Sequence, residues 1–149
     1  MEKKFVSHNE DETAAIAARI ADICQIGDVF ALSGTLGAGK SVFARAFIQR
    51  LTNADEVPSP TFTLVQTYPA KTFDIYHYDL YRLENPSEIF ELGVEDNFYS
   101  GVCLVEWPEK MGGFAPRNMW KIKIEVKDDV RCISITVDDE SKIKRLENV

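Results

Sequence analysis

The stretch Gly34-Thr35-Leu36-Gly37-Ala38-Gly39-Lys40-Ser41 decides how the chain folds. It fits the pattern G-x-x-x-x-G-K-[ST], which is the phosphate-binding loop of nucleotide hydrolases and kinases. Glycines at these positions let successive backbone N–H groups point inward at phosphate oxygens. Lys40 can then reach the β- and γ-phosphates, and the Ser41 hydroxyl can bind Mg²⁺. The stretch therefore predicts a site for a nucleoside triphosphate.

The residues on either side of this loop have the pattern that the motif requires. Val29-Phe30-Ala31-Leu32 is an apolar run of strand length, and residues 42–51 have the periodicity of a helix. A helix that begins at the loop adds its positive N-terminal end to the phosphate site. The alternative is a glycine-rich turn that only joins two elements, and the strand–loop–helix order disfavours it.

The length and charge of the chain limit the classes of function. At 149 residues the chain is long enough to bury a core, and we expect one domain over residues 1–149. A formal net charge of −7 argues against strong direct binding of nucleic acid, because proteins that grip phosphate backbones present basic faces. No apolar run approaches the ~20 residues of a membrane span. Cys24, Cys103 and Cys132 are widely spaced and odd in number, which favours reduced thiols and a cytoplasmic location.

Further elements are expected around the loop. Ser7 and Glu10 have the spacing of a capping box for a helix that runs to Ile23. The run Gly101–Val105 is apolar on both faces, which is typical of a strand inside a covered parallel sheet. The other expected elements are antiparallel strands over 62–68 and 72–79, a helix over 85–93, a hairpin of strands 120–126 and 132–137, and a short final helix.

Two carboxylates are candidates for the chemistry beside the loop. Enzymes with this loop place an acid at the end of a neighbouring strand, where it binds Mg²⁺ or orients the attacking water. Glu106 follows four apolar residues, which fits that pattern, and Asp79 lies in the polar cluster 77–82. We assign both to the site, with Glu106 as the metal ligand. The alternative for each is a solvated carboxylate at a strand end.

Other polar and aromatic residues fit two interpretations each. Thr61 lies where GTPases carry a switch threonine that senses the γ-phosphate, but threonine after proline is also common in turns. His77 fits a hydrogen-bonded histidine of a strand. Trp107 could stack on a base or a partner, or belong to the core. Arg82 and Arg131 are the arginines best placed to help with charge, and surface solvation is the alternative for both.

Four blocks of sequence together resemble the TsaE family. They are the loop Gly34–Ser41, Ser59-Pro60-Thr61-Phe62, the block His77-x-Asp79-Leu80-Tyr81-Arg82-Leu83, and Glu106-Trp107-Pro108. The resemblance covers nearly the whole chain, and the order of the blocks agrees. It implies an ATPase needed for the threonylcarbamoyl modification of adenosine 37 in tRNA. Where relatives often have Asp and Thr, this chain has Thr35 and Ser41, and serine keeps the metal-binding hydroxyl.

The resemblance also implies a fold, cofactors, partners and site residues. The fold is α/β, a single P-loop NTPase domain whose mixed sheet has a parallel core, antiparallel hairpins and helices on both faces. ATP and Mg²⁺ are the cofactors, and the chain acts on a complex of TsaB and TsaD, without strong direct tRNA binding or a membrane. The implied residues are Leu36, Gly37, Ala38, Gly39, Lys40 and Ser41 for phosphate, Ser41 and Glu106 for Mg²⁺, Lys40, Thr61, Asp79 and Glu106 for hydrolysis, and Glu10, Thr13, Trp107 and Arg131 near the base.

Two other classes of function remain open. Many short P-loop proteins are small-molecule kinases, but these usually carry an arginine-bearing lid, and the chain has no arginine-rich insertion. A nucleotide-binding regulator without turnover is the third class, and the two acids argue against it. We expect slow hydrolysis by the chain alone, because the attacking water is often positioned with the help of a partner.

Overall fold

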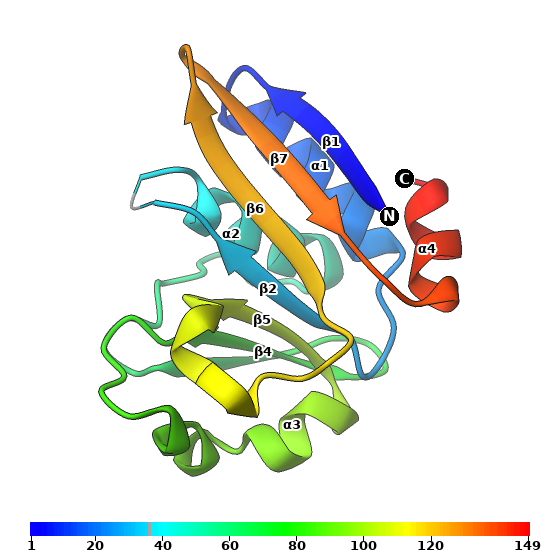
Figure 1. The fold of residues 1–149 in the computed structure, drawn as a ribbon. Coiled ribbons are helices and arrows are strands. Elements are labelled where there is room, and N and C mark those ends of the chain that lie inside the picture. The colour runs from blue at the N-terminus through cyan, green and yellow to red at the C-terminus, as the bar shows by residue number, and fades with distance from the viewer. Residues whose placement is uncertain (36) are drawn as a thin grey trace.

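A seven-stranded mixed sheet runs through the molecule (Figure 1). The structure, a computed structural model, describes residues 1–35 and 37–149. The strand order is β1-β7-β6-β2-β5-β4-β3. The strands are β1 (Glu2–Ser7), β2 (Val29–Ser33), β3 (Val65–Pro69), β4 (Asp74–Asp79), β5 (Val102–Glu106), β6 (Trp120–Lys127) and β7 (Val130–Thr136). The helices are α1 (Glu10–Asp22), α2 (Lys40–Leu51), α3 (Val94–Ser100) and α4 (Glu140–Glu147), with 3-10 segments η1 (Pro86–Leu92) and η2 (Pro108–Phe114).

The centre of the sheet is parallel. Strand β2 pairs in parallel with β5 on one side and β6 on the other, and β4 pairs in parallel with β5. All five residues of β5 are buried, which confirms the expectation of a strand covered on both faces. The carboxyl ends of β4 and β5 meet in register, because Asp79 is the pairing partner of Glu106. The predicted fold class, with its parallel core, is confirmed.

Both edges of the sheet are antiparallel. Strands β6 and β7 form the expected hairpin, and the turn residues Asp128 and Asp129 have φ of 47° and 68°. This left-handed pair is typical of a two-residue hairpin turn. The N-terminal strand β1 pairs antiparallel with β7, and no local pattern predicts a strand there. At the other edge β3 pairs with β4, as expected.

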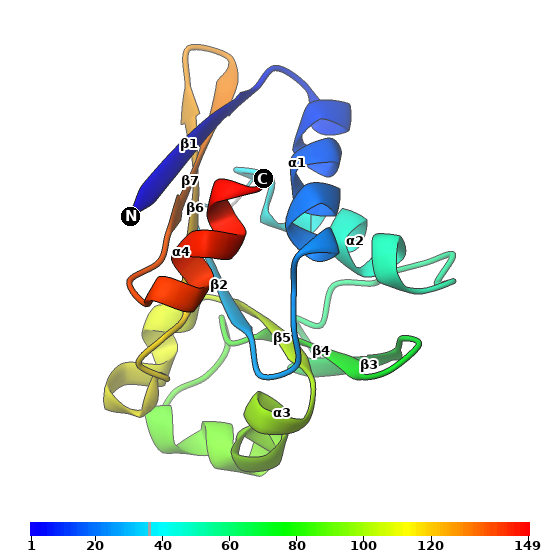
Figure 2. The ribbon, with the colours of Figure 1, turned by 90° about the vertical axis from the view of Figure 1, so that its right-hand side faces the viewer.

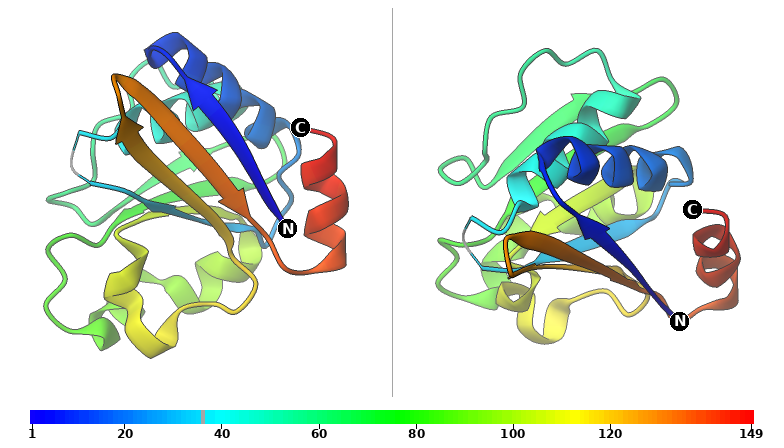
Figure 3. Two further views of the ribbon diagram at one scale, coloured as in Figure 1. Left: turned by 45° about the horizontal axis from the view of Figure 1, so that its top comes forward. Right: turned by 90° about the horizontal axis from the view of Figure 1, so that it is seen from above.

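Helices cover the sheet on both faces (Figure 2). Helices α1 and α2 lie side by side on one face, and their apolar side chains pack on Phe30, Leu32 and Leu104 of the central strands. The other face is covered by η1, α3 and η2, which pack on Tyr78, Val105 and their neighbours. Seen from above, the yellow η2 segment lies on the opposite side of the strands from α1 and α2 (Figure 3). The two faces therefore enclose two apolar clusters, one on each side of the central strands.

Three local expectations are wrong. Ser7 is not the helix cap, because it belongs to β1, and the side chain of Asn9 accepts the Glu12 N–H at 2.9 Å instead. The strand expected over 62–68 begins at Val65, because Leu64 has a φ of 69° that breaks the extended run. The helix expected over 85–93 is a 3-10 segment, and a separate helix, α3, follows it after Gly93.

Helix α4 is tied to the start of β2. The Arg145 guanidinium binds the Asp28 carboxylate at 2.7 Å and 2.9 Å and also donates to the Ile23 carbonyl oxygen.

The three cysteines are free, as expected, and burial raises the pKa of Cys24 and of Cys103 to about 12. Within the part of the chain that the structure describes, none of the helices has the length and apolar character needed to cross a membrane.

Candidate functional site

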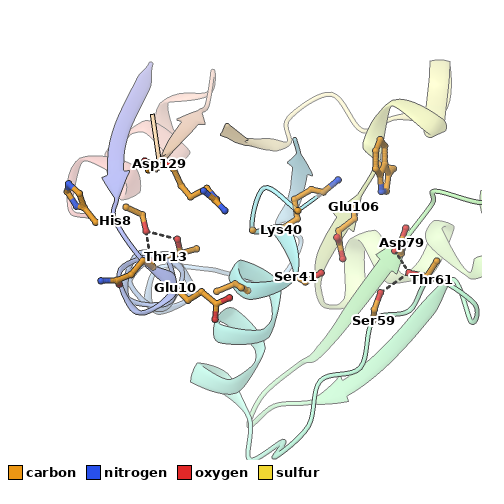
Figure 4. A pocket seen from close by; sticks show the side chains of 17 residues that line it. His8, Glu10, Thr13, Lys40, Ser41, Ser59, Thr61, Asp79, Glu106 and Asp129 are labelled. Atoms are coloured by element: carbon orange, nitrogen blue, oxygen red, sulfur yellow. Dashed lines mark hydrogen bonds between the residues drawn. The ribbon is translucent and has the colours of Figure 1, made fainter. Parts of the chain in front are cut away.

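A cavity of about 570 Å³ lies at the carboxyl ends of the central strands, where the phosphate-binding loop joins β2 to α2. Figure 4 shows three groups of side chains around it. His8, Glu10, Thr13 and Asp129 lie at one end, Lys40 and Ser41 in the middle, and Ser59, Thr61, Asp79 and Glu106 at the other end. Residues from the range 7–13, near the N-terminus, and from the range 129–131, late in the chain, therefore line the same cavity as the loop.

The loop has the backbone that its glycines permit. Gly34, Gly37 and Gly39 all have positive φ, at 144°, 81° and 113°. A Cβ on Gly34 would collide with the carbonyl oxygen of Ile124 in β6, so only glycine fits where β2 ends. Gly37 and Gly39 line the cavity, whereas Ala38 is buried beneath it. Leu36, which was assigned to phosphate, lies outside the described residues.

Lys40 is a buried cation at the first turn of α2. Only 5% of its surface is exposed. Its Nζ donates to the Gly34 carbonyl oxygen at 2.9 Å and lies 3.7 Å from the centroid of the Trp107 ring. Burial lowers the pKa of Lys40, and the nearby carboxylates of Glu106, Glu109 and Asp79 oppose that shift. The ammonium group is thus held by a carbonyl and an aromatic face, which phosphate oxygens could replace as stronger partners.

Asp79 is held by two donors at the end of β4. The Thr61 hydroxyl donates to Asp79 Oδ2 at 2.8 Å, and the Tyr81 N–H donates to Oδ1 at 3.0 Å. Ser59 Oγ lies 2.8 Å from Thr61 Oγ1, so the 59–61 segment is attached to this carboxylate. The structure therefore brings Thr61 and Asp79 together, as their assignment to one site requires.

Glu106 ends β5 in a nearly closed environment, with 5% of its side chain exposed. Its Oε2 lies 2.7 Å from Nε2 of His77, which is equally buried. The Nδ1 atom of His77 has no hydrogen-bond partner in the described part of the chain. His77 is a hydrogen-bonded strand histidine, as expected, and its partner is the predicted metal ligand.

The far end of the cavity is built by β1, α1 and the β6–β7 turn. Ser7 Oγ lies 2.6 Å from Thr13 Oγ1 and donates to the Asn9 carbonyl oxygen at 2.7 Å. Glu10, Thr13 and Arg131, the residues that the resemblance assigns to the base, all line this cavity. Because β1 pairs with β7, with Ser7 opposite Arg131, the start of α1 lies at the same end of the cavity as Arg131.

Trp107 lines the cavity, whereas Arg82 does not. Trp107 lines the cavity beside Lys40, and its ring centroid lies 5.0 Å from that of Tyr81. Trp107 is thus next to Lys40, whereas Glu10 and Thr13 lie at another part of the cavity wall (Figure 4). Arg82 is not among the lining residues of this cavity, and its guanidinium stacks on the Phe62 ring at 4.2 Å.

The donor set fits a magnesium–nucleotide complex better than a metal held by protein alone. Among residues 1–35 and 37–149, no three His, Cys, Asp or Glu side chains converge on a possible metal position. The Ser41 hydroxyl and the Glu106 carboxylate do line the same cavity. Mg²⁺ is usually held by one or two protein oxygens together with substrate phosphates and water. These two residues would supply such a partial set.

Some lining residues were not identified from the sequence. Ser7, His8 and Asn9 reach the cavity through the pairing of β1 with β7, and Asp129 reaches it through the pairing of β6 with β2; no local pattern reports either contact. Ser59 belongs to the Ser59–Phe62 block, so its place in that block was the available signal.

A family model agrees with this arrangement. The model described as TsaE, threonylcarbamoyl adenosine biosynthesis protein TsaE, matches residues 7–133. That span begins at Ser7 in β1 and ends in β7, so it includes every residue that lines the cavity.

Individual relatives and one solved structure are similar over most of their lengths. A tRNA threonylcarbamoyladenosine biosynthesis protein TsaE from Rickettsia felis is 38% identical over 142 residues, which cover 93% of this chain and 83% of that protein. The protein of the same name from Bacillus subtilis is 40% identical, covering 89% of this chain and 84% of its own. The crystal structure of Bacillus subtilis YdiB superposes with a TM-score of 0.84 at 32% identity, covering 99% of this chain and 93% of the other.

Proposed function

The chain belongs to the TsaE family of threonylcarbamoyl adenosine biosynthesis proteins, and we propose that it binds and hydrolyses Mg²⁺–ATP in the cavity at Gly34–Ser41. The hydrolysis serves the threonylcarbamoyl modification of adenosine 37 in tRNA. One observation carries the proposal. A loop lysine, a loop hydroxyl and two strand-end carboxylates converge on a single cavity, although they come from three separate parts of the sequence.

The loop and α2 hold the phosphates in this proposal. Backbone N–H groups at the start of α2 would donate to phosphate oxygens, and Lys40 would exchange its contacts with Gly34 and Trp107 for the β- and γ-phosphates. Glu10 and Thr13 lie at the end of the cavity opposite Thr61 and Asp79 (Figure 4), and together with Arg131, which also lines the cavity, they would contact the nucleoside.

Ser41 and Glu106 would hold the metal. The chemistry that bound Mg²⁺ would supply is neutralisation of the negative charge that develops on the phosphates. Asp79 has both oxygens engaged by Thr61 and Tyr81, so we assign it to orienting the 59–61 segment against the γ-phosphate. Glu106 keeps one oxygen without a described hydrogen bond, which suits it to metal or water.

Partners complete the proposal. We propose that the chain acts in the cytoplasm on a complex of TsaB and TsaD, and that these proteins accelerate its hydrolysis. The net charge of −7 supports contact with proteins over direct tRNA binding.

Binding of ATP by a lysine variant tests the site. We expect Lys40→Met to abolish ATP binding measured by calorimetry with Mg²⁺, because the variant removes the only charged group of the loop that can reach the phosphates. The matched control is Lys71→Met, which removes an exposed lysine and should leave the affinity unchanged. Equal ATP affinity in both variants would contradict the assignment.

A small-molecule kinase would instead consume ATP only when a hydroxylated metabolite is added, and its rate of ATP consumption would not change when TsaB and TsaD are added.

A further inference from the structure

A buried histidine lies behind the proposed metal ligand. His77 is 2% exposed on β4, and its Nε2 lies 2.7 Å from Oε2 of Glu106 on β5. Since an ionised carboxylate can only accept a hydrogen bond, we assign the proton of this contact to Nε2. The Nδ1 atom has no partner in the described part of the chain, which fits the same tautomer, because a proton there would be buried without an acceptor.

The two carboxylates of the site differ in how many of their oxygens accept a hydrogen bond. Asp79 and Glu106 are register partners on adjacent strands, so their charges lie close together and repel. Both oxygens of Asp79 accept a hydrogen bond, from Thr61 and from Tyr81. Glu106 has only Oε2 engaged; within the described residues nothing donates to Oε1, and the residue lines the cavity.

We propose that His77 is a positioning residue that fixes the Glu106 carboxylate, so that Oε1 is presented to the metal of the bound nucleotide. The strand geometry makes this possible, because His77 lies two residues before Asp79 and so shares its face of the sheet with Asp79 and Glu106. Hydrogen bonds to a metal-binding carboxylate set its orientation, and losing one typically lowers metal affinity by about 10–100-fold. The inference rests on the proposed function, since it assumes that Glu106 meets a metal.

Two substitutions at His77 distinguish a side chain that positions Glu106 from one that only fills space. The amide nitrogen of Gln reaches about as far as imidazole Nε2, whereas that of Asn corresponds to Nδ1 and stops short of Glu106. We expect His77→Asn to weaken Mn²⁺ binding to the ATP complex by about 10–100-fold, measured by electron paramagnetic resonance. His77→Gln should retain most of the wild-type affinity. Binding of ATP in the presence of EDTA should be the same in wild type and both variants.

The possible results are distinguishable. Wild-type Mn²⁺ affinity in His77→Asn, or equal losses in both variants, would overturn the positioning role while leaving the proposed function intact. A wild-type protein that binds no Mn²⁺ with ATP would overturn the proposed function together with this inference. Weak Mn²⁺ binding in His77→Asn that is restored in His77→Gln supports it.

A measurement without substitution covers the case in which a variant does not fold. The chain has 2 histidines, so the ring nitrogens of His77 can be assigned by ¹⁵N nuclear magnetic resonance after comparison with a variant of the exposed His8. We expect a proton on Nε2 and none on Nδ1, and a shift of the Nε2 signal when Mg²⁺ is added to the ATP complex. The opposite tautomer, or an Nε2 signal that does not respond to Mg²⁺, would overturn the proposal.

Discussion

Lys40 carries its charge inside the protein before any ligand is bound. Burial lowers its pKa from the ordinary value of 10.5, and the neighbouring carboxylates only partly oppose the shift. The folded chain therefore holds this proton less tightly than the unfolded chain does. The stability penalty is fully present at pH values below the lowered pKa, where both states are charged. The penalty disappears as the pH rises from the lowered pKa toward 10.5.

This penalty predicts that the lysine costs stability in the absence of nucleotide. We expect Lys40→Met to raise the melting temperature of the ligand-free protein by about 1–4 °C at pH 7. The gain should shrink when the melts are repeated at pH 10. A lower melting temperature than wild type at pH 7 would show that the contacts with Gly34 and Trp107 outweigh the cost of burial.

Single residues of the site were predictable where local spacing determines them. Lys40 and Ser41 follow from the motif, and Glu106 and Asp79 from their places at strand ends. The bond between His77 and Glu106 was not predictable, because it depends on the register of β4 against β5. Ser7 fails as a helix cap for a similar reason, since pairing with β7 keeps it in a strand.

Helix α4 is attached to the core by an ion pair as well as by the buried side chain of Leu146. Asp28 is 3% exposed at the start of β2, and Arg145 gives it two hydrogen bonds while its guanidinium lies 5.0 Å from the Trp120 ring. A buried carboxylate that loses its partner keeps its desolvation cost. The last helix therefore contributes to stability through this contact more than through its own short length.

The ion pair can be tested against an exposed one. We expect Arg145→Met to lower the free energy of unfolding by about 3–5 kcal/mol, measured by urea denaturation, because Asp28 is left buried and unpaired. The control is Arg50→Met, whose pair with Asp22 is about half exposed on both sides and should lose no more than about 1 kcal/mol. Similar losses of unfolding free energy in the two variants would contradict the proposal that the burial of Asp28 makes its ion pair important.

Elements with a strong local pattern were predicted correctly, and those stabilised by distant pairing were not. Strands β2 and β5 are continuous apolar runs, and the β6–β7 hairpin alternates around a polar turn. Half of the residues of strand β1 are charged, so only its pairing with β7 identifies it as a strand. Helix α3 has only seven residues, too few for a clear helical period.

At the scale of the whole molecule, the order of strands creates the site. Because β6 pairs in parallel with β2, the β6–β7 turn lies beside the phosphate-binding loop, and Asp129 and Arg131 reach the cavity. Because β1 then pairs with β7, the N-terminal segment closes the same end (Figure 3). The mixed sheet was predicted from the resemblance. The exact neighbours of each strand were not, since they depend on contacts far apart in sequence.

The most direct test of the account is ATP turnover by the wild-type chain and by Glu106→Gln, each with Mg²⁺ and each with and without TsaB and TsaD. We expect slow turnover by the wild type alone and faster turnover when both partners are present. We expect Glu106→Gln to lower the stimulated rate by about 100-fold or more, because the variant removes the carboxylate that we assign to metal and water. Turnover that is unchanged in Glu106→Gln, or that is indifferent to both partners, would contradict it.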